Sequence, residues 1–283
     1  MAQFAPVVPP QLLARMHEVS NNLVGRYHLL LAHDVAARPE EYRPVIPPAA
    51  FVIMDNSMIE LGKPVEWPIM REALKAINAR QIVLPDVYGD AKTTLEMTSE
   101  AASRWTLGEE QSFMAVPQGK TIEEYTACAK AMLNLRGVNS FGIARTFTKD
   151  FGSRQIALDI LSKLRPPKCS WGPYIHLLGF SDNFLDDMEC ARNANVIGID
   201  SAVPVREGQR GQMLTYGECP HSPRGDFWDR PADAITPETI ANLFLVREWI
   251  QPGANQWSNK VIPSMAATVE DETLPASLSN KLT

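Results

Sequence analysis

The chain lacks several features that would place it in a protein class at once. None of its apolar runs approaches the roughly 20 residues that a membrane-spanning helix needs, so we expect no membrane partner. The N-terminus has neither the basic nor the apolar segment of a secretory signal. A cytoplasmic location is therefore expected by default.

Cysteine is scarce, with four residues in 283, and none of them belongs to a Cys-x-x-Cys pair. The only hint of metal ligands is Cys219-Pro220-His221, whereas a structural zinc site needs four ligands. Widely spaced cysteines in a cytoplasmic protein are typical of free thiols. We expect no metal and no other cofactor.

A basic excess is also missing, because 27 Lys and Arg stand against 33 Asp and Glu and give a formal net charge of −6. A nucleic-acid partner would therefore need a local basic strip. The segment 205–233 offers candidate phosphate contacts, which are Arg206, Arg210, Arg224 and Arg230. The same segment holds acidic residues that dilute this charge, and Phe227 and Trp228 are its candidates for base stacking.

Short apolar runs alternate with segments of helical period, which predicts βα units and a parallel sheet. The expected strands are residues 27–32, 51–54, 81–84, 112–116, 140–144, 174–178 and 196–199. With an eighth strand late in the chain, this pattern predicts an α/β fold of the (β/α)8 TIM-barrel type. An open doubly wound sheet is the alternative, but no Gly-x-Gly-x-x-Gly follows the first strand.

We expect the barrel to form a single domain over residues 1–250, without a zinc subdomain. Residues 205–233 have little periodicity and are predicted to form a long loop after the seventh expected strand. Residues 251–283 are polar and are predicted to form a C-terminal tail. The sequence leaves the oligomeric state open.

Three of the expected strands are followed by aspartate, at Asp55, Asp86 and Asp200. The carboxyl ends of barrel strands meet at one mouth, where the active sites of such barrels lie. We expect burial there to shift the pKa values of these carboxyl groups apart, so that they take different roles. For Asp86 and the nearby Asp90, capping of the following helix is the plain structural alternative.

Read in order, the strand ends resemble the tRNA-guanine transglycosylase family, and most of all its short branch that inserts 7-deazaguanines into DNA. The resemblance covers roughly residues 51–211. Its motifs are Asp55-Asn56-Ser57-Met58-Ile59-Glu60, Asp86, Val116-Pro117-Gln118-Gly119, Phe141-Gly142-Ile143-Ala144, Tyr174-Ile175-His176-Leu177-Leu178-Gly179 and Gly198-Ile199-Asp200-Ser201-Ala202-Val203-Pro204. A phage-encoded member would act in the host cytoplasm.

The resemblance implies that Asp200 attacks C1′ of a deoxyguanosine, with Asp55 as general acid and base. It implies that Asp86 accepts hydrogen bonds from the base, and that Gln118 and the backbone N–H of Gly142 donate to the base carbonyl. Gln118 could equally bond neighbouring backbone. The other substrate-binding positions that it implies are Gly119, Ile143, Ala144 and Gly179.

The chain departs from the tRNA-modifying members because it lacks their zinc cluster, which favours DNA as the substrate. Because no extra acidic residue is evident to pair with a substrate ammonium, 7-cyano-7-deazaguanine is the expected free base. A transglycosylase acting on RNA, a barrel glycoside hydrolase and a non-catalytic nucleic-acid-binding barrel are the alternatives. His33 and His176 are expected to be structural.

Overall fold

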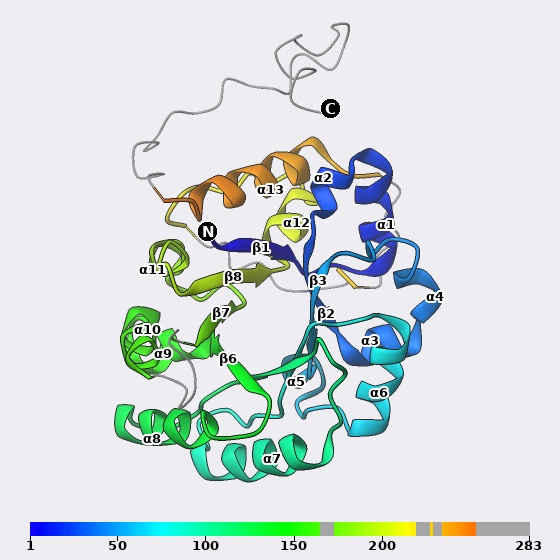
Figure 1. Ribbon diagram of the computed structural model, residues 1–283. Helices are drawn as coiled ribbons and strands as arrows, with labels where there is room; N and C mark the ends of the chain where they lie inside the picture. Colours follow the sequence, from blue (N-terminus) through cyan, green and yellow to red (C-terminus); the bar gives the residue numbers. More distant parts are fainter. Residues whose placement is uncertain (165–172, 219–226, 229–233, 253–283) are drawn as a thin grey trace, which may run out of the picture.

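The computed structural model describes residues 1–164, 173–218, 227–228 and 234–252. Within them, eight strands form one sheet (Figure 1). The strands are β1 (Gln3–Pro6), β2 (Tyr27–Leu31), β3 (Phe51–Asp55), β4 (Gln81–Val83), β5 (Ser112–Ala115), β6 (Val138–Ala144), β7 (Tyr174–Leu178) and β8 (Val196–Ser201). Each is short and buried on both faces, as parallel strands covered by helices are.

The strands pair in parallel in the order β1-β8-β7-β6-β5-β4-β3-β2. The two ends of this order, β1 and β2, lie against each other, so the sheet is a nearly closed barrel. The predicted (β/α)8 TIM-type fold is confirmed. The predicted place of the eighth strand is wrong, because in the part of the chain that the structure describes β1 at the N-terminus pairs with β8 and completes the ring.

Helices surround the ring of strands (Figure 1). They are α1 (Pro10–Val19), α2 (Asn21–Val24), α3 (Ala32–Ala37), α4 (Pro39–Tyr42), α5 (Met58–Leu61), α6 (Trp67–Ala76), α7 (Ala91–Arg104), α8 (Ile122–Met132), α9 (Thr146–Phe151), α10 (Arg154–Lys163), α11 (Phe184–Ala191), α12 (Val203–Gly208) and α13 (Pro237–Trp249). No helix of the described residues is both long and apolar enough to cross a membrane.

The predicted loop at 205–233 is helical at its start, since α12 extends to Gly208. Pro204 lies in the first turn of α12, where proline needs no hydrogen-bond donor and its fixed φ suits the helix. Residues 219–226 and 229–233 of this loop lie outside the described residues, as does most of the predicted tail. The two described cysteines, Cys128 and Cys190, are buried and free.

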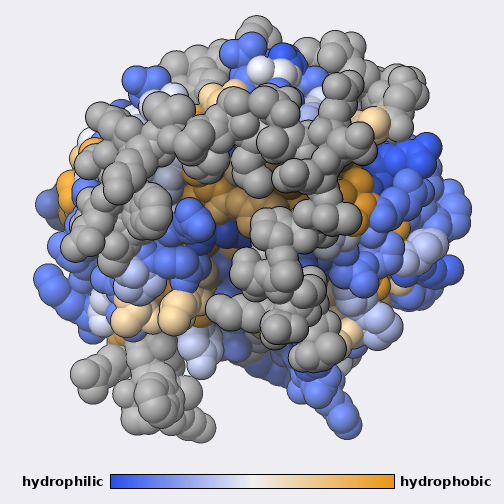
Figure 2. Space-filling view, turned by 90° about the horizontal axis from the view of Figure 1, so that it is seen from above, coloured by the Kyte–Doolittle hydropathy of each residue, from blue (hydrophilic) through white to orange (hydrophobic). Residues whose placement is uncertain are grey.

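Apolar side chains fill two regions, one between strands and helices and one inside the barrel. Because side chains alternate along a strand, every second residue points into the barrel. The inner cluster includes Tyr27, Leu29 and Leu31 of β2. The outer surface seen in Figure 2 is mostly hydrophilic, and its apolar residues gather near the middle of that face.

Gly198 of β8 makes room for Tyr27 inside the barrel. A Cβ atom at Gly198 would lie 2.4 Å from Cε1 of Tyr27 and 2.5 Å from its hydroxyl oxygen. We therefore expect Gly198→Ala to lower the free energy of unfolding by roughly 1–3 kcal/mol, as overpacking does in other cores. Urea titration measures this loss. Gly108→Ala is the control, since its Cβ would meet only the flexible side chain of Gln111, and equal stability of the two variants would contradict the prediction.

Candidate active site at the carboxyl ends of the strands

A pocket of about 150 Å³ opens at the carboxyl ends of the strands. Its floor is apolar and consists of side chains that end the strands, among them Val7, Leu31, Val83, Val116 and Leu178. Its polar lining consists of Asp55, Asn56, Glu60, Asp86, Arg145, Thr146, Asp200, Ser201 and Arg206. The three aspartates singled out by the sequence therefore meet in one pocket, together with Ala144 and Gly179.

Asp200 projects from β8 and is held through one carboxylate oxygen. Its Oδ1 accepts hydrogen bonds from Nε2 of His176 at 3.0 Å and from the backbone N–H of Gly179 at 3.1 Å. Gly179 has a φ of 68°, a conformation that glycine adopts without strain. The described residues place no hydrogen bond on Oδ2 of Asp200, so this oxygen is left to meet a ligand.

Asp55 ends β3 and lies on the pocket wall. The backbone N–H of Ser57 donates to its Oδ2 at 2.7 Å, and Ser57 has a φ of 59°. A non-glycine residue in the left-handed region costs conformational energy and is enriched at functional sites. Burial, and next the charge of Glu60, raise the pKa of Asp55 well above its ordinary value. Asp55 is thus suited to hold a proton that it can give up.

Asp86 follows β4 and is held by two amide side chains. Nδ2 of Asn56 donates to its Oδ1 at 3.1 Å, and Nε2 of Gln118 donates to its Oδ2 at 2.8 Å. Burial raises the pKa of Asp86 to about 6, against these two hydrogen bonds, which lower it. Asp90 is the residue that caps α7, through the backbone N–H of Thr93, so the capping alternative applies to Asp90 and not to Asp86.

Asn56 is a site residue that the sequence reading passed over. Its Nδ2 also donates to the backbone oxygen of Leu84 at 2.8 Å, and its Oδ1 accepts from the N–H of Met58. These bonds tie the end of β3 to the end of β4. An amide residue directly after the aspartate that ends an apolar run is the sequence signal that could have revealed it.

His176 was expected to be structural, and the sequence reading did not connect it with Asp200. Its ring is fully buried inside the barrel, with Nε2 on Asp200 and Nδ1 at 2.8 Å from the hydroxyl of Tyr27. His176 and Leu178 are two positions apart on β7, so their side chains lie on the same face of the strand and both point into the barrel. A histidine at an inward position next to a catalytic candidate was the available signal.

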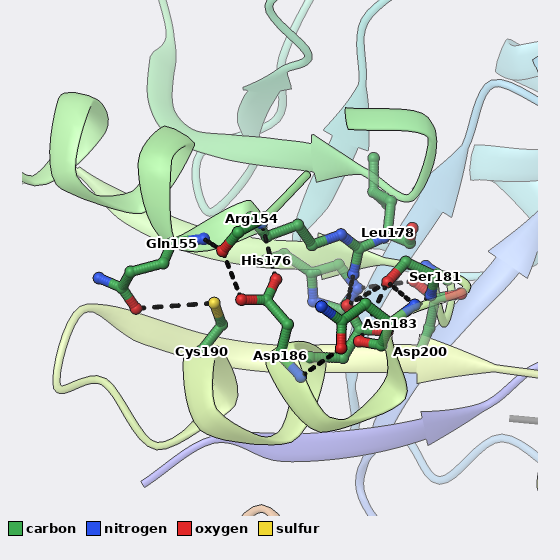
Figure 3. Close-up of polar contacts among 12 residues, drawn as sticks. Arg154, Gln155, His176, Leu178, Ser181, Asn183, Asp186, Cys190 and Asp200 are labelled. Carbon is green, nitrogen blue, oxygen red and sulfur yellow. Dashed lines mark hydrogen bonds and ion pairs between the residues drawn. The ribbon is translucent and has the colours of Figure 1, made fainter. Parts of the chain in front are cut away.

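A buried ion pair supports the loop that holds Asp200, and Figure 3 shows Arg154, Leu178 and Ser181 close to Asp200. Arg154 of α10 is fully buried, pairs with Asp187 of α11 at 3.2 Å and donates to the backbone oxygen of Leu178 at 2.8 Å. Asp187 in turn accepts from the N–H and hydroxyl of Ser181. These contacts fix both ends of the turn whose middle residue, Gly179, donates to Asp200.

Several of the implied substrate-binding residues do not reach the pocket. Gln118 uses its amide to hold Asp86, and its Oε1 accepts from the backbone N–H of Gly89 at 3.2 Å. Gly119, like Gln118, lines a separate small cavity. Gly142 lies within β6 beside His176, where its missing side chain leaves room for Leu178. Ile143 points away from the pocket into the core between strands and helices.

The predicted arginine contacts are only partly described. Arg206 lines the pocket, but it is buried and its Nε donates to Glu207 at 2.8 Å. Arg210 is half-buried and its Nη1 lies 3.6 Å from the same Glu207 oxygen. Arg224 and Arg230 fall outside the described residues. In contrast to Arg206, Arg145 lines the pocket and is exposed.

Two lining features bear on the choice of substrate. Glu60 lies at the pocket wall, so the stated reason for preferring a neutral 7-cyano group, the absence of an extra acidic residue, does not hold. Phe180, Phe227 and Trp228 also line the pocket, which contains more aromatic surface than the sequence suggested. Within the described residues, no group of three or more His, Cys, Asp or Glu side chains is arranged to hold a metal ion.

Neither protein-family models nor curated proteins match this chain. The family resemblance therefore rests on the residues quoted above.

Proposed function

We propose that this barrel is a base-exchange transglycosylase that replaces guanine in DNA with a free 7-deazaguanine. The observation that carries the proposal is the contrast between two carboxyl groups of one pocket. Asp200 keeps Oδ2 open while Oδ1 is fixed, and Asp55 has a raised pKa. A nucleophile and a proton donor are the two groups that glycosidic exchange requires.

In the first half of the reaction, Oδ2 of Asp200 attacks C1′ as the bond from C1′ to N9 of guanine breaks. The electron pair of that bond leaves with the base, and Asp55 supplies the proton that neutralises it. In the second half, Asp55 accepts the N9 proton of the incoming base, whose N9 then displaces Asp200 from C1′. Two displacements retain the configuration of the sugar.

Asp86 supplies the recognition of guanine in this proposal. Each carboxylate oxygen can accept about two hydrogen bonds, and one on each is used by Asn56 and Gln118. The remaining capacity suits the N1–H and the exocyclic amine of a guanine-like base, which are neighbouring donors. The pKa of about 6 leaves Asp86 ionised, and hence acceptor-only, near neutral pH.

The pocket can take the target only as an extruded nucleotide, because C1′ and N9 are not accessible within a stacked duplex. The exposed Arg145 at its rim is a candidate phosphate contact. The missing zinc cluster of the tRNA enzymes supports DNA as the polymer.

Base exchange is tested by incubating the protein with single-stranded DNA, duplex DNA and tRNA, each with 7-cyano- or 7-aminomethyl-7-deazaguanine. Digestion to nucleosides and mass spectrometry then reveal exchange. We expect incorporation into DNA. Comparison of the rates with the two free bases shows whether Glu60 selects a cationic 7-substituent. Incorporation into tRNA alone would replace DNA by RNA as the substrate, and exchange with none of the three would refute the function.

The affinity for the free base should depend on pH through Asp86. The ionised form of Asp86 accepts hydrogen bonds from the base, so the affinity should be at its maximum roughly one pH unit above the pKa of about 6. Below this pKa the affinity should fall about tenfold per pH unit. Calorimetric titration of the base between pH 5 and about pH 8 measures this. In Asp86→Asn the affinity should be low and nearly independent of pH, and an unchanged profile would remove Asp86 from the role.

A glycoside hydrolase remains the second candidate, because Phe180, Phe227 and Trp228 give the pocket aromatic surface that a sugar ring can stack against. It would use the same Asp200 and Asp55 as nucleophile and acid. Release of free sugar from aryl glycosides, without base exchange on any nucleic acid, would favour it.

A further inference from the structure

Tyr27 and His176 form a buried connection to Asp200 that runs across the barrel. The hydroxyl of Tyr27 lies 2.8 Å from Nδ1 of His176, and Nε2 of His176 lies 3.0 Å from Oδ1 of Asp200. Tyr27 belongs to β2, whereas His176 belongs to β7, and across the closure of the barrel β1 and β8 lie between these two strands. Such a contact therefore needs space inside the barrel.

Two glycines provide this space. Gly142 of β6 and Gly198 of β8 are the register partners of His176 on its two sides. A Cβ at Gly198 would lie within 2.5 Å of the Tyr27 hydroxyl, and a Cβ at Gly142 would lie 2.6 Å from Leu178. The positions directly beside His176 on the two neighbouring strands thus carry no side chain, and among the described residues its ring nitrogens are bonded to Tyr27 and Asp200.

Of the two neutral tautomers of His176, only one gives each of these groups a partner when Asp200 is ionised. If Tyr27 donates to Nδ1, the ring proton is on Nε2 and is donated to Oδ1. If Nδ1 carried the proton instead, the lone pair of Nε2 would face the carboxylate, and the Tyr27 hydroxyl would lose its acceptor. Burial, and next the charge of Asp200, raise the pKa of Tyr27 well above its ordinary value, so its hydroxyl keeps the proton it donates.

We propose that Tyr27 and His176 are positioning residues that fix the Nε2–H tautomer, hold Oδ1 of Asp200 and thereby select Oδ2 as the atom that attacks the sugar. The consequence for the reaction rests on the proposed function, while the tautomer does not. In the glycosyl ester, Oδ1 becomes the carbonyl oxygen and keeps both donors, His176 and Gly179. The carboxylate therefore need not rotate between the two halves of the reaction.

The tautomer is measured directly by ¹⁵N NMR of the histidine side chains, with His176→Gln identifying the signal of His176. The wild-type protein should show a ring proton on Nε2 and a lone pair on Nδ1. In Tyr27→Phe, which keeps the ring that packs against Phe51, Nδ1 loses its hydrogen-bond donor, so its ¹⁵N signal should shift toward that of a lone pair without a partner, while Nε2 keeps the proton it donates to Asp200. A wild-type ring protonated on Nδ1, or no change in Tyr27→Phe, would overturn the proposal.

Kinetics supply the second readout. Tyr27→Phe and His176→Leu should lower kcat for guanine exchange about 10- to 100-fold, with KM for the free base unchanged, because Asp86 and its partners are untouched. His176→Gln should recover most of this loss, since glutamine carries both an acceptor and a donor at its end. Tyr88→Phe is the matched control, because its exposed hydroxyl contacts only Asp150. Equal losses in the leucine and glutamine variants would contradict the positioning role.

Failure of the proposed function is distinguishable from failure of this inference. If the wild-type protein exchanges no base with any nucleic acid, the function fails, and the NMR result alone decides whether Tyr27 and His176 set the tautomer. If exchange occurs but the tautomer is on Nδ1, the function stands and the positioning role is refuted.

Discussion

Asp200→Asn is expected to lower the rate of guanine exchange at least about 1000-fold, because an amide nitrogen cannot form the glycosyl ester. The fold should persist, since Oδ1 of asparagine can still accept from His176 and Gly179 as the aspartate does. The measurement is the exchange of labelled guanine into guanine-containing single-stranded DNA. Labelled guanine can enter by the reverse of the step that releases guanine. The assay therefore does not require knowledge of the 7-substituent of the natural base.

Asp159→Asn is the matched control for this variant. Asp159 is exposed on α10 and contacts Gln155, far from the lining of the pocket. It should exchange guanine at the wild-type rate. Thermal unfolding of both variants should match the wild type, and full activity in Asp200→Asn would show that another group forms the bond to C1′.

Asp55→Asn should cost about 100- to 10,000-fold in the exchange rate, the range that loss of a general acid or base produces. Asparagine can still accept from the N–H of Ser57, so the left-handed turn at Ser57 should survive. What it cannot do is give a proton to the departing guanine or take one from the incoming base. The kcat of this variant should also lose the pH dependence that titration of Asp55 imparts to the wild type.

Asp90→Asn is the control for Asp55→Asn, because Asp90 also follows a strand but serves only as a helix cap. Asparagine caps helices about as well as aspartate does, so stability and exchange should both be unchanged. If Asp55→Asn loses less than about tenfold, Asp55 is not the proton donor, and the neighbouring Glu60 becomes the candidate.

The barrel was predictable from the sequence because its strands are buried on both faces and appear as apolar runs. The strand β1 was not, since it is only four residues long, begins with the exposed Gln3 and ends in Pro6. Its strand character comes from pairing with β8, a contact between opposite ends of the chain. The helix α12 was also missed, because residues 205–233 show little periodicity, whereas Pro204 lies in the first turn of this short helix.

The ends of the strands predicted which aspartates share a pocket, because parallel strands bring their carboxyl ends together. The sequence could not show how each is held. Gln118 could contact either the base or Asp86, and the structure shows that it contacts Asp86. Arg206 could be open to phosphate, but it pairs with Glu207. Such choices depend on contacts that the sequence pattern does not reveal. The link from Tyr27 to His176 spans 149 positions and depends on the room left by Gly198.

The central claim is a covalent bond between Asp200 and a nucleic-acid sugar, and mass spectrometry tests it most directly. The protein is incubated with guanine-containing single-stranded DNA without free base, denatured and digested with protease and nuclease. We predict a deoxyribosyl adduct on the peptide that contains Asp200, absent from Asp200→Asn and increased when released guanine is removed. An adduct on any other residue, or none with either DNA or RNA, would contradict the account.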